Sequence, residues 1–106
     1  MPEHYFWSEV CEGWYLLDRA DISVIEELMP PGTKEVRHSH SRANQLFFVL
    51  EGKLTIEVYG VVKHLHTGDA LNISPETVHQ ARNEEADPVR FLVISAPSTK
   101  GDRQPA

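Results

Sequence analysis

The sequence has little cysteine, no long hydrophobic run and no cluster of basic residues, and each shortage excludes a class of protein. Its single cysteine, Cys11, cannot form an internal disulfide, which fits a reducing compartment. The longest apolar run is residues 46–50, whereas a membrane-spanning helix needs about 20 apolar residues. Duplex nucleic acid requires clustered Lys and Arg, but this chain has 10 basic and 16 acidic residues. With no signal-peptide pattern at the polar N-terminus, we expect a cytoplasmic protein without a nucleic-acid or membrane partner.

The composition is that of one globular domain. A length of 106 residues is usual for a single domain, and 41% hydrophobic with 25% charged residues is ordinary for a folded protein. We expect the core to cover about residues 14–96, followed by a polar tail at 97–106 that is loose or lies along the surface or a partner.

Glycine and proline recur at short intervals and no segment has the pattern of a long helix, which predicts an all-β protein. Residues 54–59 alternate apolar and polar side chains, and Gly60 joins them to 61–65 as a hairpin. Other strands are expected at 14–17, 22–29, 45–50, 70–73, 78–82 and 89–94. A total of roughly eight or nine short strands predicts a sandwich, a jelly roll or a small barrel.

Four residues have the chemistry and spacing of a metal site. His38 and His40 are two apart, so in a strand both imidazoles point to the same face. Gln45 begins the next predicted strand, and His79 lies in a third segment. Three nitrogens and one amide oxygen from neighbouring strands suit a first-row divalent ion.

Two stretches within residues 32–83 resemble the two sequence motifs of the cupin superfamily. The first has Gly32, five residues, His38-Ser39-His40, four residues, Gln45, six residues and Gly52, with glutamine where cupins carry glutamate. The second has Gly68-Asp69, then Ser74-Pro75-Glu76-Thr77-Val78-His79, then Asn83. It departs from the family pattern in two ways, because Glu76 stands at the usual glycine and a common second proline is missing.

The resemblance implies a small single-domain, type 2-like cupin with a jelly-roll fold, which is also called a double-stranded β-helix. It makes His38, His40, Gln45 and His79 the ligands of one divalent metal ion, which is Zn, Mn, Fe, Ni or Cu. The glutamine leaves the identity and affinity of the metal open. Cupins with this glutamine resemble small proteins that act on unsaturated uronate sugars, which favours sugar-acid chemistry.

Other residues are candidates for a ligand pocket around the metal. Phe47 and Val49 share a face with the glutamine by alternation, so they line the pocket or fill the core. Asn83 either hydrogen-bonds a metal ligand or caps a turn. Several arginines could hold a carboxylate, and Arg42 is nearest the pocket mouth by sequence. The arginines considered are Arg37, Arg42, Arg82 and Arg90.

Two further pairs have a functional and a structural interpretation. Glu26 and Glu27 interrupt an apolar strand, so one of them could face the pocket as a general acid or base, although an exposed outer face is the preferred interpretation. His64 and His66 repeat the two-residue spacing, but no third ligand follows at a suitable distance. We expect this second pair to lie on a solvated sheet edge.

These observations predict a metal-binding cupin that acts on a small oxygen-rich organic acid or sugar derivative. Neutral imidazole and amide ligands leave the charge of a divalent ion uncompensated, so the ion is a strong Lewis acid for isomerase, lyase or dioxygenase chemistry. The alternative is a non-catalytic cupin that binds or senses a small molecule. We also expect a homodimer, because edge strands invite pairing and the N-terminal residues Tyr5, Phe6, Trp7 and Trp14 are apolar.

Overall fold

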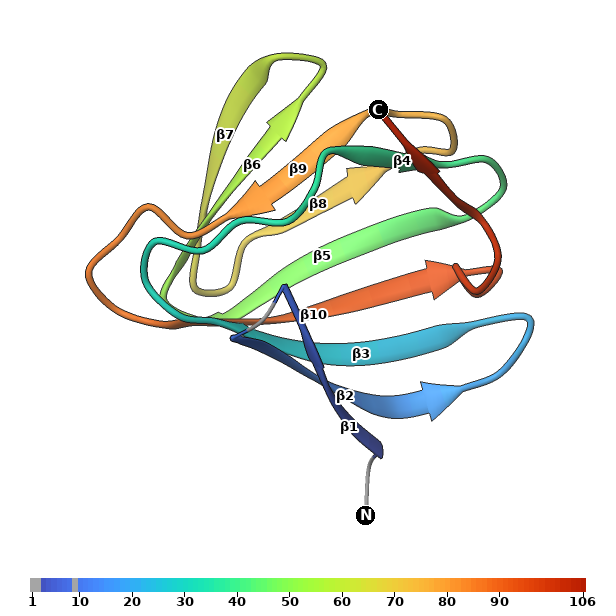
Figure 1. Ribbon diagram of the computed structural model, residues 1–106, viewed down its shortest axis with the longest axis horizontal. Coiled ribbons are helices and arrows are strands. Elements are labelled where there is room, and N and C mark those ends of the chain that lie inside the picture. Colours follow the sequence, from blue (N-terminus) through green and yellow to red (C-terminus); the bar gives the residue numbers. More distant parts are fainter. Residues whose placement is uncertain (1–2, 9) are drawn as a thin grey trace.

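The computed structural model describes residues 3–8 and 10–106, which form eleven strands in two antiparallel sheets (Figure 1). The first sheet has the order β1 (Glu3–Trp7), β2 (Cys11–Asp18), β3 (Ser23–Met29), β10 (Val89–Ala96), β5 (Asn44–Glu51), β8 (Ala70–Ile73). The second has the order β11 (Arg103–Pro105), β4 (His38–His40), β9 (His79–Arg82), β6 (Lys53–Val58), β7 (Val61–His66). The described residues contain no helix suited to crossing a membrane.

This architecture confirms the predicted all-β jelly roll, with more strands than the expected eight or nine. The additional elements are short, because β4 and β11 have three residues each and β1 has five. Such lengths carry too few alternations to produce a clear strand pattern in the sequence.

Side-chain alternation on the long strands fills the space between the sheets. In β5, Gln45, Phe47 and Val49 are buried, whereas Leu46 and Leu50 are exposed. Val49 pairs with Phe91 of β10, and both are fully buried in the apolar core. Along the same strands, Gln45 pairs with Ser95, so polar groups replace apolar ones toward one end of the interior.

The C-terminal segment lies against the strand that carries two histidines. β11, in the dark red C-terminal segment of Figure 1, pairs with β4. The register places Arg103 opposite His40. Just before β11, the buried carboxylate of Asp102 accepts hydrogen bonds of 2.9–3.2 Å from the backbone N–H groups of residues 41–43. Residues 97–106 therefore hold the loop that joins β4 to β5.

The apolar N-terminal residues take different places. Tyr5 and Trp7 line a cavity, and the guanidinium of Arg90 lies 5.3 Å from the ring centre of Trp14. Phe6 remains 64% exposed on β1, at the edge of its sheet. The homodimer stays a prediction.

Candidate metal centre

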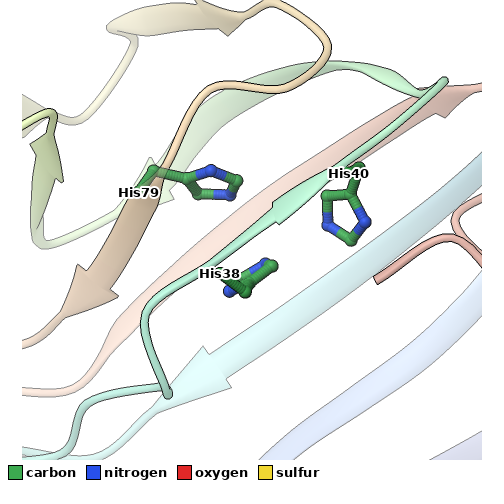
Figure 2. A group of neighbouring side chains, drawn as sticks. All are labelled: His38, His40 and His79. Carbon is green, nitrogen blue, oxygen red and sulfur yellow. The ribbon is translucent and has the colours of Figure 1, made fainter. Parts of the chain in front are cut away.

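Three histidines from two adjacent strands converge between the sheets. His38 of β4 pairs directly with His79 of β9, and His40 follows two residues later on the same face of β4. One nitrogen from each ring lies within 4.8 Å of the other two, and Figure 2 shows the three rings gathered around one space. All three residues are buried, so these side chains could hold a metal ion away from bulk solvent.

The backbone orients two of these rings in the same way. Nδ1 of His38 is 2.8 Å from the carbonyl oxygen of Val36, and Nδ1 of His79 is 2.9 Å from that of Thr77. Because a carbonyl can only accept, Nδ1 carries the proton in each neutral ring and Nε2 keeps its lone pair. Hydrogen bonds of this kind fix ring orientation in metal-ligating histidines.

Three buried polar atoms at this site have no hydrogen-bond partner among the described residues. They are Nδ1 of His40, Nε2 of His79 and Oε1 of Gln45. The side-chain N–H of Gln45 donates to Ser95 Oγ at 3.1 Å, which leaves its oxygen free. An unsatisfied buried polar atom costs about 1–3 kcal/mol. A metal ion would satisfy such atoms, so the donor set fits a divalent cation.

Burial keeps the imidazoles in the form that coordinates a metal. Desolvation lowers the pKa of His38 to about 3 and that of His40 to about 4, and it also lowers the pKa of His79. The positive charge of Arg103 acts in the same direction on each of them. At neutral pH the three rings are therefore uncharged and need no deprotonation before binding a metal.

A cavity of about 200 Å³ adjoins this centre, and His38, His40 and Gln45 line it. Its walls also carry two carboxyl groups, those of Glu27 and Glu35. The sequence allowed one of Glu26 and Glu27 to face the pocket only as the less favoured interpretation, and it did not point to Glu35. The remaining polar and aromatic lining comes from Tyr5, Trp7, Tyr15, Phe47, Ser95, Thr99 and Arg103. The pocket thus combines acidic, basic and aromatic side chains beside the candidate ligands.

The structure brings one of the four predicted pocket residues to this cavity. Phe47 lines it, whereas Val49 lies in the apolar core. Asn83 is buried and stabilises the turn that follows β9, because its amide donates to the carbonyls of Met29 and Asp87. The Arg42 side chain is 66% exposed and lines a separate surface hollow.

The other arginines considered as carboxylate ligands are paired with glutamates. Arg37 and Arg82 both contact Glu57 at the surface. Arg90 contacts Glu26 at 2.6 Å, which places Glu26 on the outer face of β3. Arg103 is the arginine that lines the cavity, and the three-residue strand that carries it has no pattern to reveal this position.

The turn before His79 contains the most visible departure from the cupin motifs. Glu76, at the usual glycine position, has a φ of 65°, a conformation that side chains with a Cβ seldom adopt. Its N–H donates to the His40 carbonyl at 2.6 Å, and the Tyr59 hydroxyl donates to its carbonyl at 2.9 Å. The first bond ties the turn to the strand that carries His38 and His40, and the second ties it to the residue that follows β6.

A small double-stranded β-helix with a buried three-histidine site is the class of protein that this geometry defines. A family model described as the cupin domain matches residues 25–95, and the chain belongs to that family. It is similar to KdgF from Halomonas sp., with 21% identity, a TM-score of 0.82 and coverage of 91% of this chain and 86% of that one. It also resembles a cupin-superfamily sugar phosphate isomerase from Silicibacter pomeroyi, with 22% identity, a TM-score of 0.75 and coverage of 85% and 61%.

A sequence relative is an uncharacterised protein of Methanocaldococcus jannaschii. The two are 28% identical over 75 residues, which are 71% of this chain. The match spans 60% of the relative's length. This relative therefore supports a shared domain but gives no information about the reaction.

Proposed function

We propose that this protein is a metal-dependent enzyme that isomerises, or eliminates a group from, a small oxygen-rich organic acid or sugar derivative. The observation that carries the proposal is the set of neutral, buried ligands beside a cavity that also holds two carboxyl groups. His38, His40, His79 and Gln45 would hold the ion. When bound, a divalent ion supplies Lewis-acid polarisation of a carbonyl or hydroxyl oxygen.

The size and lining of the cavity favour a small polar substrate. Its volume of about 200 Å³ lies below the roughly 300–1,000 Å³ of pockets for drug-sized ligands. Arg103 offers a cationic group for a carboxylate, and Tyr15 and Thr99 offer hydroxyls for sugar-like oxygens. Among proteins that share the fold, one is described as a sugar phosphate isomerase, so this architecture is compatible with the reaction class.

The alternative is a cupin that binds a small molecule without transforming it. A binding site needs complementary polar groups but has no need of a proton-transfer residue. The half-buried carboxyl of Glu27, directed at the same cavity as the ligands, favours catalysis over simple binding.

Metal analysis combined with a matched ligand pair tests the proposal. The purified protein should contain about one divalent ion per chain. In isothermal titration, the metal-loaded protein should bind D-galacturonate more tightly than D-galactose, which lacks the carboxylate. Proton NMR of a panel of sugar acids and α-hydroxy aldehydes should then reveal isomerised or dehydrated products. Binding without product formation on any of them would support the non-catalytic alternative instead.

A further inference from the structure

A row of residues crosses three strands of the larger sheet and ends at a carboxyl group. In register, Tyr5 of β1 pairs with Gly13 of β2, and Gly13 pairs with Glu27 of β3. Paired residues share a face, and both Tyr5 and Glu27 line the cavity beside the histidines. The sheet therefore presents a phenol and a carboxyl group to the same space.

Gly13 allows these two side chains to approach each other. A Cβ added at Gly13 would lie 2.5 Å from the hydroxyl oxygen of Tyr5, so the phenol occupies the place of the missing side chain. The end of the Tyr5 ring thus lies over β2 and extends toward Glu27. Glu27 is on β3, two strands away from the backbone of Tyr5. Any larger residue at position 13 would displace the ring.

Of the two cavity carboxyl groups, Glu27 has the fewer fixed contacts. Glu35 is already engaged, because its Oε2 accepts the Ala81 N–H at 2.8 Å and its Oε1 lies 3.8 Å from His38 Nδ1. Among the described residues, no backbone N–H donates to the Glu27 carboxyl. The Tyr5 hydroxyl approaches it across Gly13.

The surroundings of Glu27 favour a proton at neutral pH. Burial, followed by the charge of Glu35, raises the pKa of Glu27 to about 8, and the Tyr5 hydroxyl and Arg103 offset only part of the increase. Tyr15 is a further titratable group facing it from β2. A group with a pKa near the working pH can both accept and donate a proton, which is the requirement for general acid–base catalysis.

We propose that Glu27 is the general acid–base residue of this cavity, positioned by Tyr5 across Gly13, and that its substrate is a small α-hydroxy aldehyde or ketone. This role rests on the proposed function. The Glu27 carboxylate removes the proton from the carbon next to the carbonyl. The electron pair of that C–H bond forms the carbon–carbon double bond of an enediolate, as the electron pair of the C=O double bond moves onto the carbonyl oxygen. Glu27 returns the proton to the former carbonyl carbon, while the hydroxyl proton moves to the former carbonyl oxygen. The isomer forms without an oxidant or reductant.

The first test measures the proton on Glu27 without any reaction. Thermal unfolding of metal-free wild type and of Glu27→Gln is followed from about pH 5 to pH 8. The contribution of Glu27 to wild-type stability should fall as pH rises through this range, because the unfolded state ionises at Glu27 while the folded state keeps the proton. The melting temperature of Glu27→Gln should therefore rise relative to the wild type. A constant difference across the range would overturn the proposal.

The second test follows exchange of the carbon-bound proton. Zinc-loaded protein is incubated in deuterated water with D-glyceraldehyde or D-glucuronate, and deuterium at carbon 2 is measured by NMR. The exchange rate of Glu27→Gln should be at least about 100-fold lower than that of the wild type. Glu26→Gln, the same change on the outer face of the same strand, should retain it. Equal rates in wild type and Glu27→Gln would overturn the role of Glu27 but not the proposed function. A wild type inert toward both probes would overturn the proposed function, and this role with it.

Two further variants separate positioning from direct participation. Glu27→Gln should bind Zn²⁺ within about twofold of wild type, because Glu27 is not placed among the ligands; loss of zinc would make it a ligand and contradict the proposal. Tyr5→Phe should retain zinc and shift the pH profile of exchange, since it removes the hydroxyl beside the carboxyl. An unchanged pH profile in Tyr5→Phe would remove Tyr5 from the proposal.

Discussion

The molecule contains two His-x-His pairs with the same spacing and very different surroundings. His38 and His40 lie on β4, between β9 and β11, and both are buried. His64 and His66 lie on β7, at the edge of the same sheet, and both are exposed. Equal spacing places each pair on one face of a strand, but only β4 has a neighbour that supplies a third histidine.

The neighbouring strands explain this difference. Opposite His38 in the register stands His79, whereas opposite His64 stands Thr55, whose hydroxyl lies 3.2 Å from the His64 ring. A metal site needs several donors around one point, and a hydroxyl on a single partner strand does not provide them. Among the described residues, the triad of His38, His40 and His79 is the one group of three or more His, Cys, Asp or Glu side chains suited to an ion.

Removing one histidine from each region should give the largest contrast. His79→Ala leaves two imidazoles and an amide, so affinity for Zn²⁺ should fall by at least about 100-fold. His66→Ala should change it by less than twofold. Competition with a chelator measures the affinities, and elemental analysis measures bound metal. Equal metal content in wild type and His79→Ala would show that the triad is not the binding site.

Each histidine pair is followed by a loop that an aspartate carboxylate holds, and these two aspartates provide a second contrast. Asp102 accepts N–H groups of residues 41–43 beside His40, and exposed Asp69 accepts the N–H of His66 at 2.8 Å. Asp102→Asn should lower the free energy of unfolding by about 2–3 kcal/mol, because a buried amide cannot accept with both atoms. Asp69→Asn should cost less than about 1 kcal/mol. Chemical denaturation of both variants measures the difference, and equal losses would contradict the anchoring role of the C-terminal segment.

The effect of burial on the first pair can be measured through pH. The folded-state pKa of His38 is about 3, whereas an ordinary histidine has about 6.5, so the unfolded state binds a proton that the folded state excludes. The contribution of this residue to stability is present above about pH 6.5 and is lost as pH falls toward 3. His38→Gln has no imidazole at this position, so it should not lose this contribution to stability as pH falls.

In metal-free protein, His38→Gln should therefore gain roughly 1–3 kcal/mol relative to wild type between pH 7 and pH 4. Denaturant titrations at several pH values measure this difference. A difference that does not vary with pH would show that the ring of His38 is solvated in solution.

The smallest expected effect comes from the charge of the fourth candidate ligand. Gln45→Glu adds one negative charge, and one charge about 4 Å away changes the energy of a bound anion by at most roughly 4 kcal/mol at an effective dielectric of 20. Solvent in an open pocket should reduce this to about 1–2 kcal/mol. The variant should bind metal more tightly and a sugar acid about tenfold to thirtyfold more weakly, while a neutral sugar is less affected. Isothermal titration measures all three, and weaker metal binding would remove Gln45 from the ligand set.

Much of this site could be predicted from local patterns, because a strand alternates its faces whatever surrounds it. His38 with His40, and Gln45 with Phe47, share a face for that reason. The distance between the segments could not be predicted in the same way. Val49 shares the face of Gln45 but lies in the apolar core, because four residues along β5 move a side chain from the cavity to the middle of the sandwich.

The choice between Glu26 and Glu27 shows the limit of the sequence most clearly. Both faces of β3 carry apolar residues, so alternation predicts that one glutamate faces inward without saying which. The tertiary structure selects Glu27, because its neighbours Ile25 and Met29 are buried between the sheets while Arg90 pairs with Glu26 outside.

By itself, the sequence determined the strand-rich fold, the cupin motifs and the face that each candidate ligand occupies, because these depend on spacing along one strand. Only the tertiary structure decided which side chains meet. It placed Arg103 beside His40 through a strand of three residues, and it brought Tyr5 over Gly13 toward Glu27. The pairing of distant strands creates these contacts, and no periodicity within either strand contains that information.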